Sequence, residues 1–95
     1  MDKISFRDLT CVEFEFDEEK HSVPVTEKNL AMCDSDYEDT REFWTGFKDY
    51  DAQVIISTEN KDEDSEMLQV KGSYVNVYEI GGNEVIGEAN IISLS

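Results

Sequence analysis

The chain has 95 residues, of which 23 are Asp or Glu and eight are Lys or Arg, so its formal net charge is −15 at pH 7. Nucleic acids and anionic membrane surfaces need a basic footprint, so this charge argues against direct binding to either and favours a basic protein partner or metal cations. With 39% hydrophobic and 11% aromatic residues, the chain can bury one modest core, and we expect a single acidic domain over residues 1–95.

The start of the chain is polar and contains no apolar signal region, and no run approaches the ~20 apolar residues that span a bilayer. We therefore expect a cytoplasmic protein without membrane contact. The cysteines, Cys11 and Cys33, form no CxxC motif, so reduced thiols are expected unless the fold brings the two together.

Residues 10–17 give the clearest strand pattern, because apolar and acidic side chains alternate along them. Such alternation predicts a half-buried strand with an acidic outer face. The acids on that face are Glu13, Glu15 and Asp17.

A polar turn over residues 17–20 then leads to a possible short strand at 21–25. Pro24 lacks a backbone N–H, which confines this strand to a sheet edge or an irregular position. Residues 26–33 fit either one helical turn capped by Thr26 or a simple connection.

Residues 35–50 show a helical pattern. Ser35, followed three residues later by Glu38, has the spacing of a capping box. On a 3.6-residue period one stripe then collects Thr40, Phe43, Trp44, Phe47 and Tyr50. The pattern predicts a helix whose apolar stripe packs on a sheet, with acids on its other side.

After an apolar strand at 52–58, residues 59–66 lack any apolar side chain and predict a solvated loop. Residues 68–80 read as a long strand whose alternation slips near Gly72, where a β-bulge would restore the phase. The sequence Gly-Gly-Asn at 81–83 predicts a hairpin turn, and the chain returns as a strand over 84–94.

Together these elements predict an α+β domain, with a four- or five-stranded antiparallel sheet and one helix packed on a face. The strand order cannot be read from the sequence.

No motif for catalysis or for a cofactor appears, so we expect neither enzymatic activity nor a cofactor or metal. Asp34, Asp36 and Glu38 have the spacing of an EF-hand loop, but Asp39 and Thr45 occupy the positions that need Gly and Glu. A loose cation site in an acidic cluster remains an alternative. A single histidine, His21, cannot complete a closed zinc site even with both cysteines.

The acidic residues are segregated along the chain. Residues 13–66 hold eighteen acids and five bases, whereas residues 67–95 hold three acids and one lysine. Rows of carboxylates can occupy Lys and Arg sites that otherwise bind phosphates, and they steer association from a distance. The expected contact residues are Glu13, Glu15, Asp17, Asp36, Asp39 and Glu42, with Tyr37 as an aromatic anchor.

These properties predict a non-enzymatic inhibitor that blocks the basic nucleic-acid-binding surface of a nuclease or other nucleic-acid-binding effector. The chain is similar in kind to bacterial nuclease immunity proteins and to phage anti-restriction or anti-CRISPR proteins that imitate DNA, although it shares no motif with them. One alternative is an adaptor that binds a protein partner through the edge of a hairpin over residues 67–95. Another is that the acidity serves solubility alone.

Overall fold

The chain folds into a single antiparallel sheet in the computed structural model, which describes residues 3–26, 28–29, 40–60 and 67–95. A short 3-10 helix, η1 (Phe6–Asp8), follows the first strand. The strands are β1 (Lys3–Ser5), β2 (Cys11–Phe16), β3 (Glu19–Pro24), β4 (Thr40–Phe47), β5 (Tyr50–Asn60), β6 (Met67–Glu79) and β7 (Val85–Leu94).

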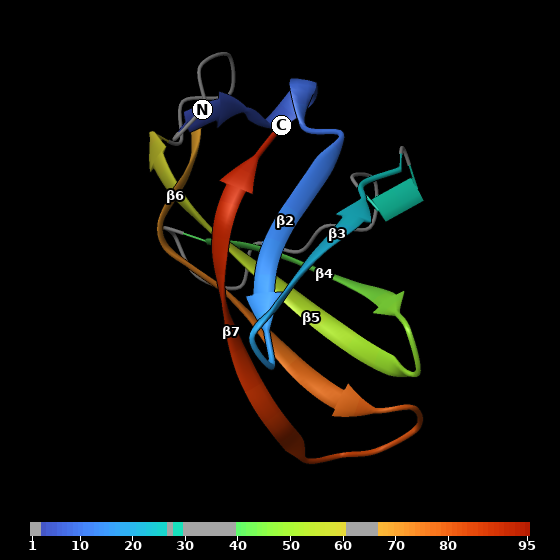
Figure 1. Ribbon diagram of the computed structural model, residues 1–95. Helices are drawn as coiled ribbons and strands as arrows, with labels where there is room; N and C mark the ends of the chain where they lie inside the picture. The colour runs from blue at the N-terminus through green and yellow to red at the C-terminus, as the bar shows by residue number, and fades with distance from the viewer. Residues whose placement is uncertain (1–2, 27, 30–39, 61–66) are drawn as a thin grey trace.

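The strand order is β3-β2-β7-β6-β5-β4, and β1 pairs with the first residues of β6. Figure 1 shows that the sheet curls strongly, so that β2 and β3 lie in front of β4 and β5 and the whole has the shape of a half-barrel. The described end of the chain is tied to the start of β2, because the Thr10 and Cys11 N–H groups donate to the Ser95 carbonyl at 2.6 and 2.8 Å.

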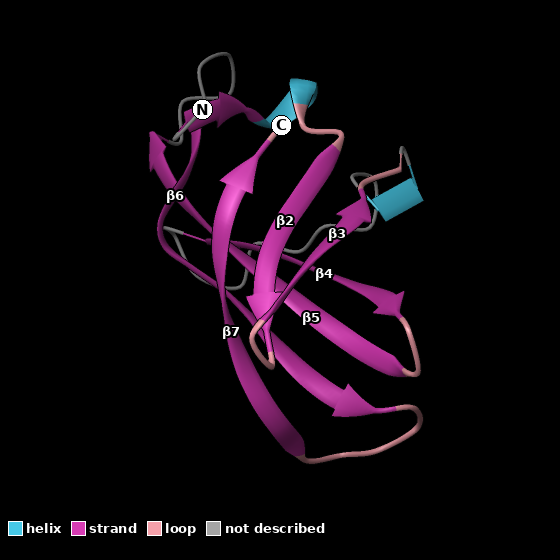
Figure 2. Cartoon of the chain, in the orientation of Figure 1, coloured by secondary structure: helices cyan, strands magenta, loops and turns pink. Residues whose placement is uncertain are grey.

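The predicted helix over residues 35–50 is wrong where the structure describes it. Residues 40–50 form β4, a turn and the start of β5, and Figure 2 shows no helix on a face of the described sheet. The fold is therefore nearly all β instead of α+β. The proposed capping box, Ser35 with Glu38, lies outside the described residues.

A spacing of four residues misled the helical interpretation. Phe43 and Phe47 share a face on a helix, but they also share a face on a strand, whose side chains alternate with a period of two. Both are buried, whereas Trp44, on the opposite face of β4, is 50% exposed. Thr and aromatic residues also favour strands, and pairing with β5 decides the outcome.

The predicted number of strands is also too low, because the sheet has seven strands instead of four or five. Residues 59 and 60 of the expected loop at 59–66 belong to β5, which continues to Asn60. The remaining residues of that loop, 61–66, lie outside the described residues.

Several strand predictions are confirmed. β2 has the predicted alternation, with Val12 and Phe14 buried. β3 is an edge strand and ends at Pro24. Asp17 and Glu18 join the two strands with φ of 55° and 64°, as in a tight hairpin turn with both central residues in the left-handed region.

The connection after β3 begins with a capped turn. Thr26 Oγ1 accepts a hydrogen bond from the Asn29 N–H at 3.2 Å, and Asn29 Oδ1 accepts one from the Thr26 N–H at 3.1 Å. Reciprocal bonds of this kind are those of a capping box. Of the segment 26–33, for which a helical turn or a simple connection was predicted, residues 27 and 30–33 lie outside the described residues.

The predicted bulge in β6 is present. Gly72 has a φ of +84°. Between Tyr74 and Gln69, β6 contains more residues than the segment of β5 with which it pairs. The buried Ser73 hydroxyl supports the irregular step, because it accepts from the Ser57 N–H at 2.8 Å and donates to the Gln69 carbonyl at 2.6 Å. The backbone groups that the bulge would leave unpaired are thereby satisfied.

The inner face of the curled sheet forms the core. Its largest fully buried side chains are Phe14, Leu9, Ile56, Leu68, Leu94, Val12, Val23, Val54, Val75 and Val77. They come from β2, β3, β5, β6, β7 and the segment before β2, so the two ends of the sheet share one core.

Aromatic side chains join the ends of the sheet where β3 and β4 are not paired. The ring of Phe47 in β4 lies 4.9 Å from that of Phe14 and 5.2 Å from that of His21, measured between centroids. On the surface, Lys48 Nζ lies 2.9 Å from Glu19 Oε2. This hydrogen bond and the charge of Lys48 lower the pKa of Glu19, while Glu19 raises the pKa of Lys48.

We predict that Gly87→Ala destabilises the fold, because a Cβ at this position would lie 2.6 Å from Cε1 of Phe16. The overpacked inner face should lower the free energy of unfolding by about 1–3 kcal/mol, measured by urea denaturation. Gly46→Ala is the matched control, since its nearest neighbour, the Tyr50 carbonyl, is 3.7 Å away. Equal stabilities of the two variants would contradict the packing of Phe16 on Gly87.

We also predict that Ser73→Ala lowers the free energy of unfolding by about 1–3 kcal/mol, because the Ser57 N–H loses its acceptor. Ser22→Ala, on the exposed edge strand β3, should leave urea denaturation almost unchanged. A neutral Ser73→Ala variant would show that the hydroxyl does not support the bulge.

Candidate interaction face

The outward side chains of the sheet form a continuous face, which we call the outer face. The pairing register aligns them in rows that cross the strands. One row is Glu15, Asn90, Tyr74, Ile55 and Glu42, and the next is Glu88, Asn76, Gln53 and Trp44.

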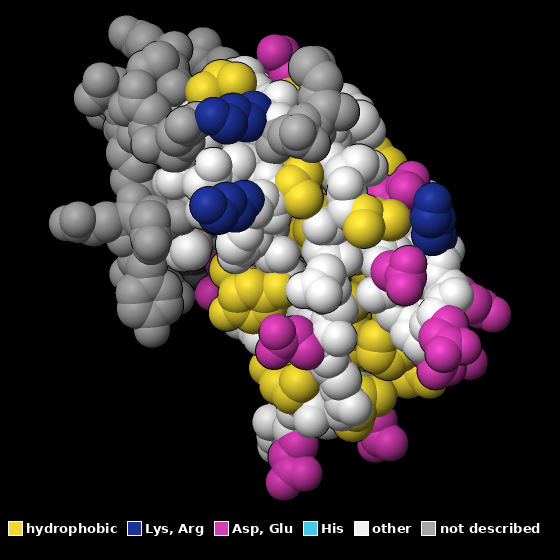
Figure 3. Space-filling view, turned by 60° about the vertical axis from the view of Figure 1, so that its left-hand side comes forward, with side chains coloured by type: hydrophobic (Ala, Val, Ile, Leu, Met, Phe, Trp, Pro, Cys, Tyr) yellow, Lys and Arg dark blue, Asp and Glu magenta, His cyan; other side chains and the backbone are white. Residues whose placement is uncertain are grey.

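Three of the predicted contact acids, Glu13, Glu15 and Glu42, lie on the outer face. Glu15 and Glu42 stand at opposite ends of one row, separated by four strand spacings, or about 19 Å along the sheet. Figure 3, which brings the β6–β7 side forward, shows carboxylates interspersed with apolar side chains over the lower part of that view. The charge on the described sheet is therefore a spaced array.

The remaining predicted contacts are placed differently. Asp17 is exposed in the β2–β3 turn, beside a cavity of about 180 Å³ between this turn and the β4–β5 turn. Glu42 lies on β4, a strand, instead of on the predicted helix. Asp36, Tyr37 and Asp39 lie outside the described residues.

The structure reveals an aromatic and polar group on the outer face that the sequence analysis missed. We call it the outer cluster; it comprises Glu42, Trp44, Gln53, Asn76 and Tyr78. The rings of Trp44 and Tyr78 meet at 5.1 Å between centroids, although one belongs to β4 and the other to β6. Trp44 was expected in the core, and only the parity of β4 shows that it points outward.

Hydrogen bonds fix the polar members of the outer cluster. Gln53 Nε2 donates to Glu42 Oε1 at 2.8 Å, and Gln53 Oε1 accepts from Asn76 Nδ2 at 3.1 Å and from the Tyr78 hydroxyl at 3.3 Å. The side chain of Gln53 thus connects three strands. All four polar side chains are half-buried, so their orientation is set by the sheet.

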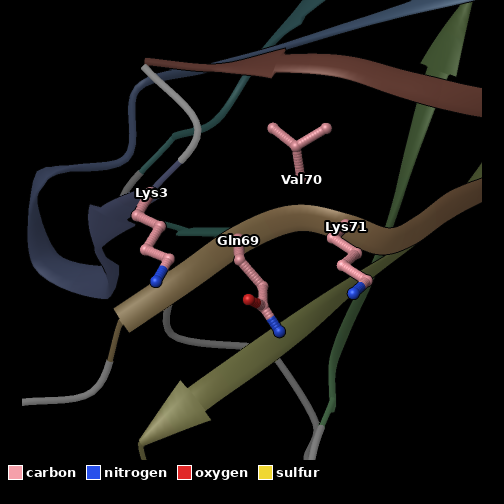
Figure 4. Close-up of a pocket in the computed structure, with 4 residues that line it drawn as sticks. All are labelled: Lys3, Gln69, Val70 and Lys71. Carbon is pink, nitrogen blue, oxygen red and sulfur yellow. The ribbon is translucent and has the colours of Figure 1, made fainter.

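A hollow of about 500 Å³ opens at the β1–β6 end of the molecule. Figure 4 shows that Lys3, Gln69 and Lys71 point to one side of the strands there, while Val70 points to the other. Two lysines in this hollow give the described surface a basic end, away from the carboxylates of β2 and β7.

Metal-ligating residue types do not gather into one site in the described residues. No group of three or more His, Cys, Asp or Glu in this part of the chain could hold a metal ion. His21 lies among aromatic rings, where its Nε2 is 3.3 Å from the Phe16 carbonyl oxygen. Cys11 is a free thiol, and Cys33 lies outside the described residues.

The C-terminal hairpin, β6 with β7, lies inside the sheet, which changes the alternative adaptor hypothesis. β6 pairs with β5 and β7, and residues 90–94 of β7 pair with β2. Within the described chain, residues 85–89 are registered only with β6. The other edge of β7 is therefore unpaired in the described chain at residues 85–89, where Val85 and Ile86 are 49% and 47% exposed.

Comparisons with known proteins give no relative from which a function could be transferred. No protein family matches the chain, and neither a curated protein nor a solved structure matches it. In the part of the chain that the structure describes, no helix is long and apolar enough to cross a membrane.

We predict that the chain's single tryptophan, Trp44, is readily quenched by acrylamide in the folded protein, because half of its surface is exposed. Acrylamide is neutral, so the negative charge of the protein does not repel it. The Trp44→Phe variant, which has no tryptophan, gives the background emission to subtract, and free tryptophan gives the upper limit of quenching. A folded protein whose tryptophan resists acrylamide would contradict the outward orientation of Trp44.

Proposed function

We propose that this protein is a non-enzymatic inhibitor that binds the basic nucleic-acid-binding surface of a protein partner, such as a nuclease or a nucleic-acid-binding complex. The proposal includes a cytoplasmic location and a DNA-mimicking mode of action. The observation that carries it is the outer face, where Glu13, Glu15 and Glu42 project from one side of one sheet in a chain of net charge −15.

The geometry supports a surface contact with a basic protein. Carboxylates on a sheet are spaced by its strands, so a partner meets an array of fixed negative charges. Such an array attracts Lys and Arg side chains that otherwise contact phosphates, and it raises the rate of association at low salt. The exposed Trp44 and its neighbour Tyr78 add an apolar anchor of the kind that dominates binding energy at interfaces.

Charge reversal on the outer face is the test of this proposal. We predict that Glu13→Lys, Glu15→Lys and Glu42→Lys together abolish capture of a basic nucleic-acid-binding partner from a bacterial lysate at about 50 mM salt, where surface charges are weakly screened. The captured partner should be released by duplex DNA in competition. Circular dichroism of the variant should match that of the parent protein.

A matched control separates position from net charge. Asp8→Lys, Glu18→Lys and Glu84→Lys change the net charge equally, but these exposed residues lie in η1 and in two turns. The control variant should retain most of the binding. Equal loss in both variants, or a partner that duplex DNA does not displace, would overturn the proposal.

A second candidate function rests on the open edge of β7. Residues 85–89 are registered with β6 alone in the described chain, and Val85 and Ile86 are exposed there. An extended segment of a partner protein could pair with these backbone groups as an added strand. Such binding would persist at about 500 mM salt, because main-chain pairing and apolar burial are screened little.

A further inference from the structure

Trp44 and Glu42 stand side by side on the outer face. They are two residues apart on β4, so their side chains leave the same side of the strand about 6.7 Å from each other. Trp44 remains 50% exposed although Tyr78 contacts its ring. Glu42 is half-buried, so part of an aromatic ring and part of a carboxylate side chain reach the surface side by side.

Neighbouring strands hold both side chains in place before any ligand binds. Glu42 Oε1 accepts from Gln53 Nε2, and Gln53 is itself bonded to Tyr78. Tyr78 also contacts the ring of Trp44. Glu42 and Trp44 are therefore linked through side-chain contacts with Gln53 and Tyr78. A carboxylate has two oxygens and about four acceptor positions, so Glu42 keeps capacity for a further donor.

An arginine side chain has the chemistry that this arrangement fits. Its guanidinium is planar, stacks on aromatic rings and donates to carboxylates in a fork, whereas the lysine ammonium is a compact and strongly hydrated charge. The fold already contains a contact of this kind, since Arg41 Cζ lies 4.8 Å from the centroid of the Phe6 ring. The net charge of −15 adds long-range attraction for a cation.

We propose that the outer cluster is a receptor for an arginine side chain, which stacks on Trp44 and donates to Glu42. Gln53 and Tyr78 act as positioning residues, because they hold the carboxylate and the ring. This inference deepens the proposed function, since it names the group of the basic partner that the outer face recognises.

The test compares two peptides of equal charge, blocked hexa-arginine and blocked hexa-lysine, bound to the full chain at physiological salt and measured by calorimetry. The arginine peptide should bind about fivefold more tightly, the size of a stacked and exposed guanidinium contact. It should also change the fluorescence of Trp44, the chain's single tryptophan. Equal affinities for the two peptides would overturn the proposal.

Variants connect the preference to the cluster. Trp44→Leu and Glu42→Gln should each reduce the arginine preference to about one, while Trp44→Phe should keep part of it, because a phenyl ring still offers a face. Glu15→Gln is the matched control for Glu42→Gln, since it removes one carboxylate from the far end of the same row. It should weaken both peptides equally and leave the preference intact; an unchanged preference in Trp44→Leu would refute the site.

Failure of this inference can be distinguished from failure of the proposed function. An arginine preference that depends on Trp44, without competition between a captured partner and DNA, would support the receptor and reject the inhibitor. Competition with DNA and no arginine preference would support the inhibitor and reject the receptor.

Discussion

A single sheet must bury its own apolar face, and the rest of this structure depends on that constraint. The described residues place no helix and no second sheet against the inner face, so the sheet curls until its two ends share one core. Phe47 completes the curl by packing against Phe14 and His21 from the opposite end. Gly87 leaves room for Phe16 on the same inner face. Burial of apolar area thus replaces the hydrogen bonds that a closed barrel would have between β3 and β4.

Curling also determines what the opposite face displays. Apart from Thr58 and Ser73, the buried inner positions are filled by apolar residues, so the acids and large polar side chains of the same strands project outward. Glu15 and Glu42 are far apart in the sequence, yet register places them in one row. The side chain of Gln53 is hydrogen-bonded to side chains of β4 and β6, which fixes the polar side chains in the middle of the outer face. The proposed inhibitor function and the arginine receptor both follow from this division of faces.

The sequence predicted those elements whose signals are local. The alternation of β2, the edge position of β3 and the bulge at Gly72 could be read because each depends on a few neighbouring residues. The helical prediction failed because Phe43 and Phe47 fit both periods. The tight turn between β4 and β5 contains Lys48 instead of a glycine signal. The site was only partly predicted: Glu15 lies on the expected face, whereas the outer cluster exists only once register brings three strands together.

The position of β2 has a consequence for the order of folding. β2 lies between β3 and β7, and its partner Leu94 is synthesised long after Val12. The Thr10 hydroxyl and the Ser95 carbonyl are hydrogen-bonded across 85 residues of sequence. Contacts of such separation close large loops and slow folding. The β2–β3 hairpin is synthesised before β7, but it joins the rest of the described sheet only through its pairing with β7.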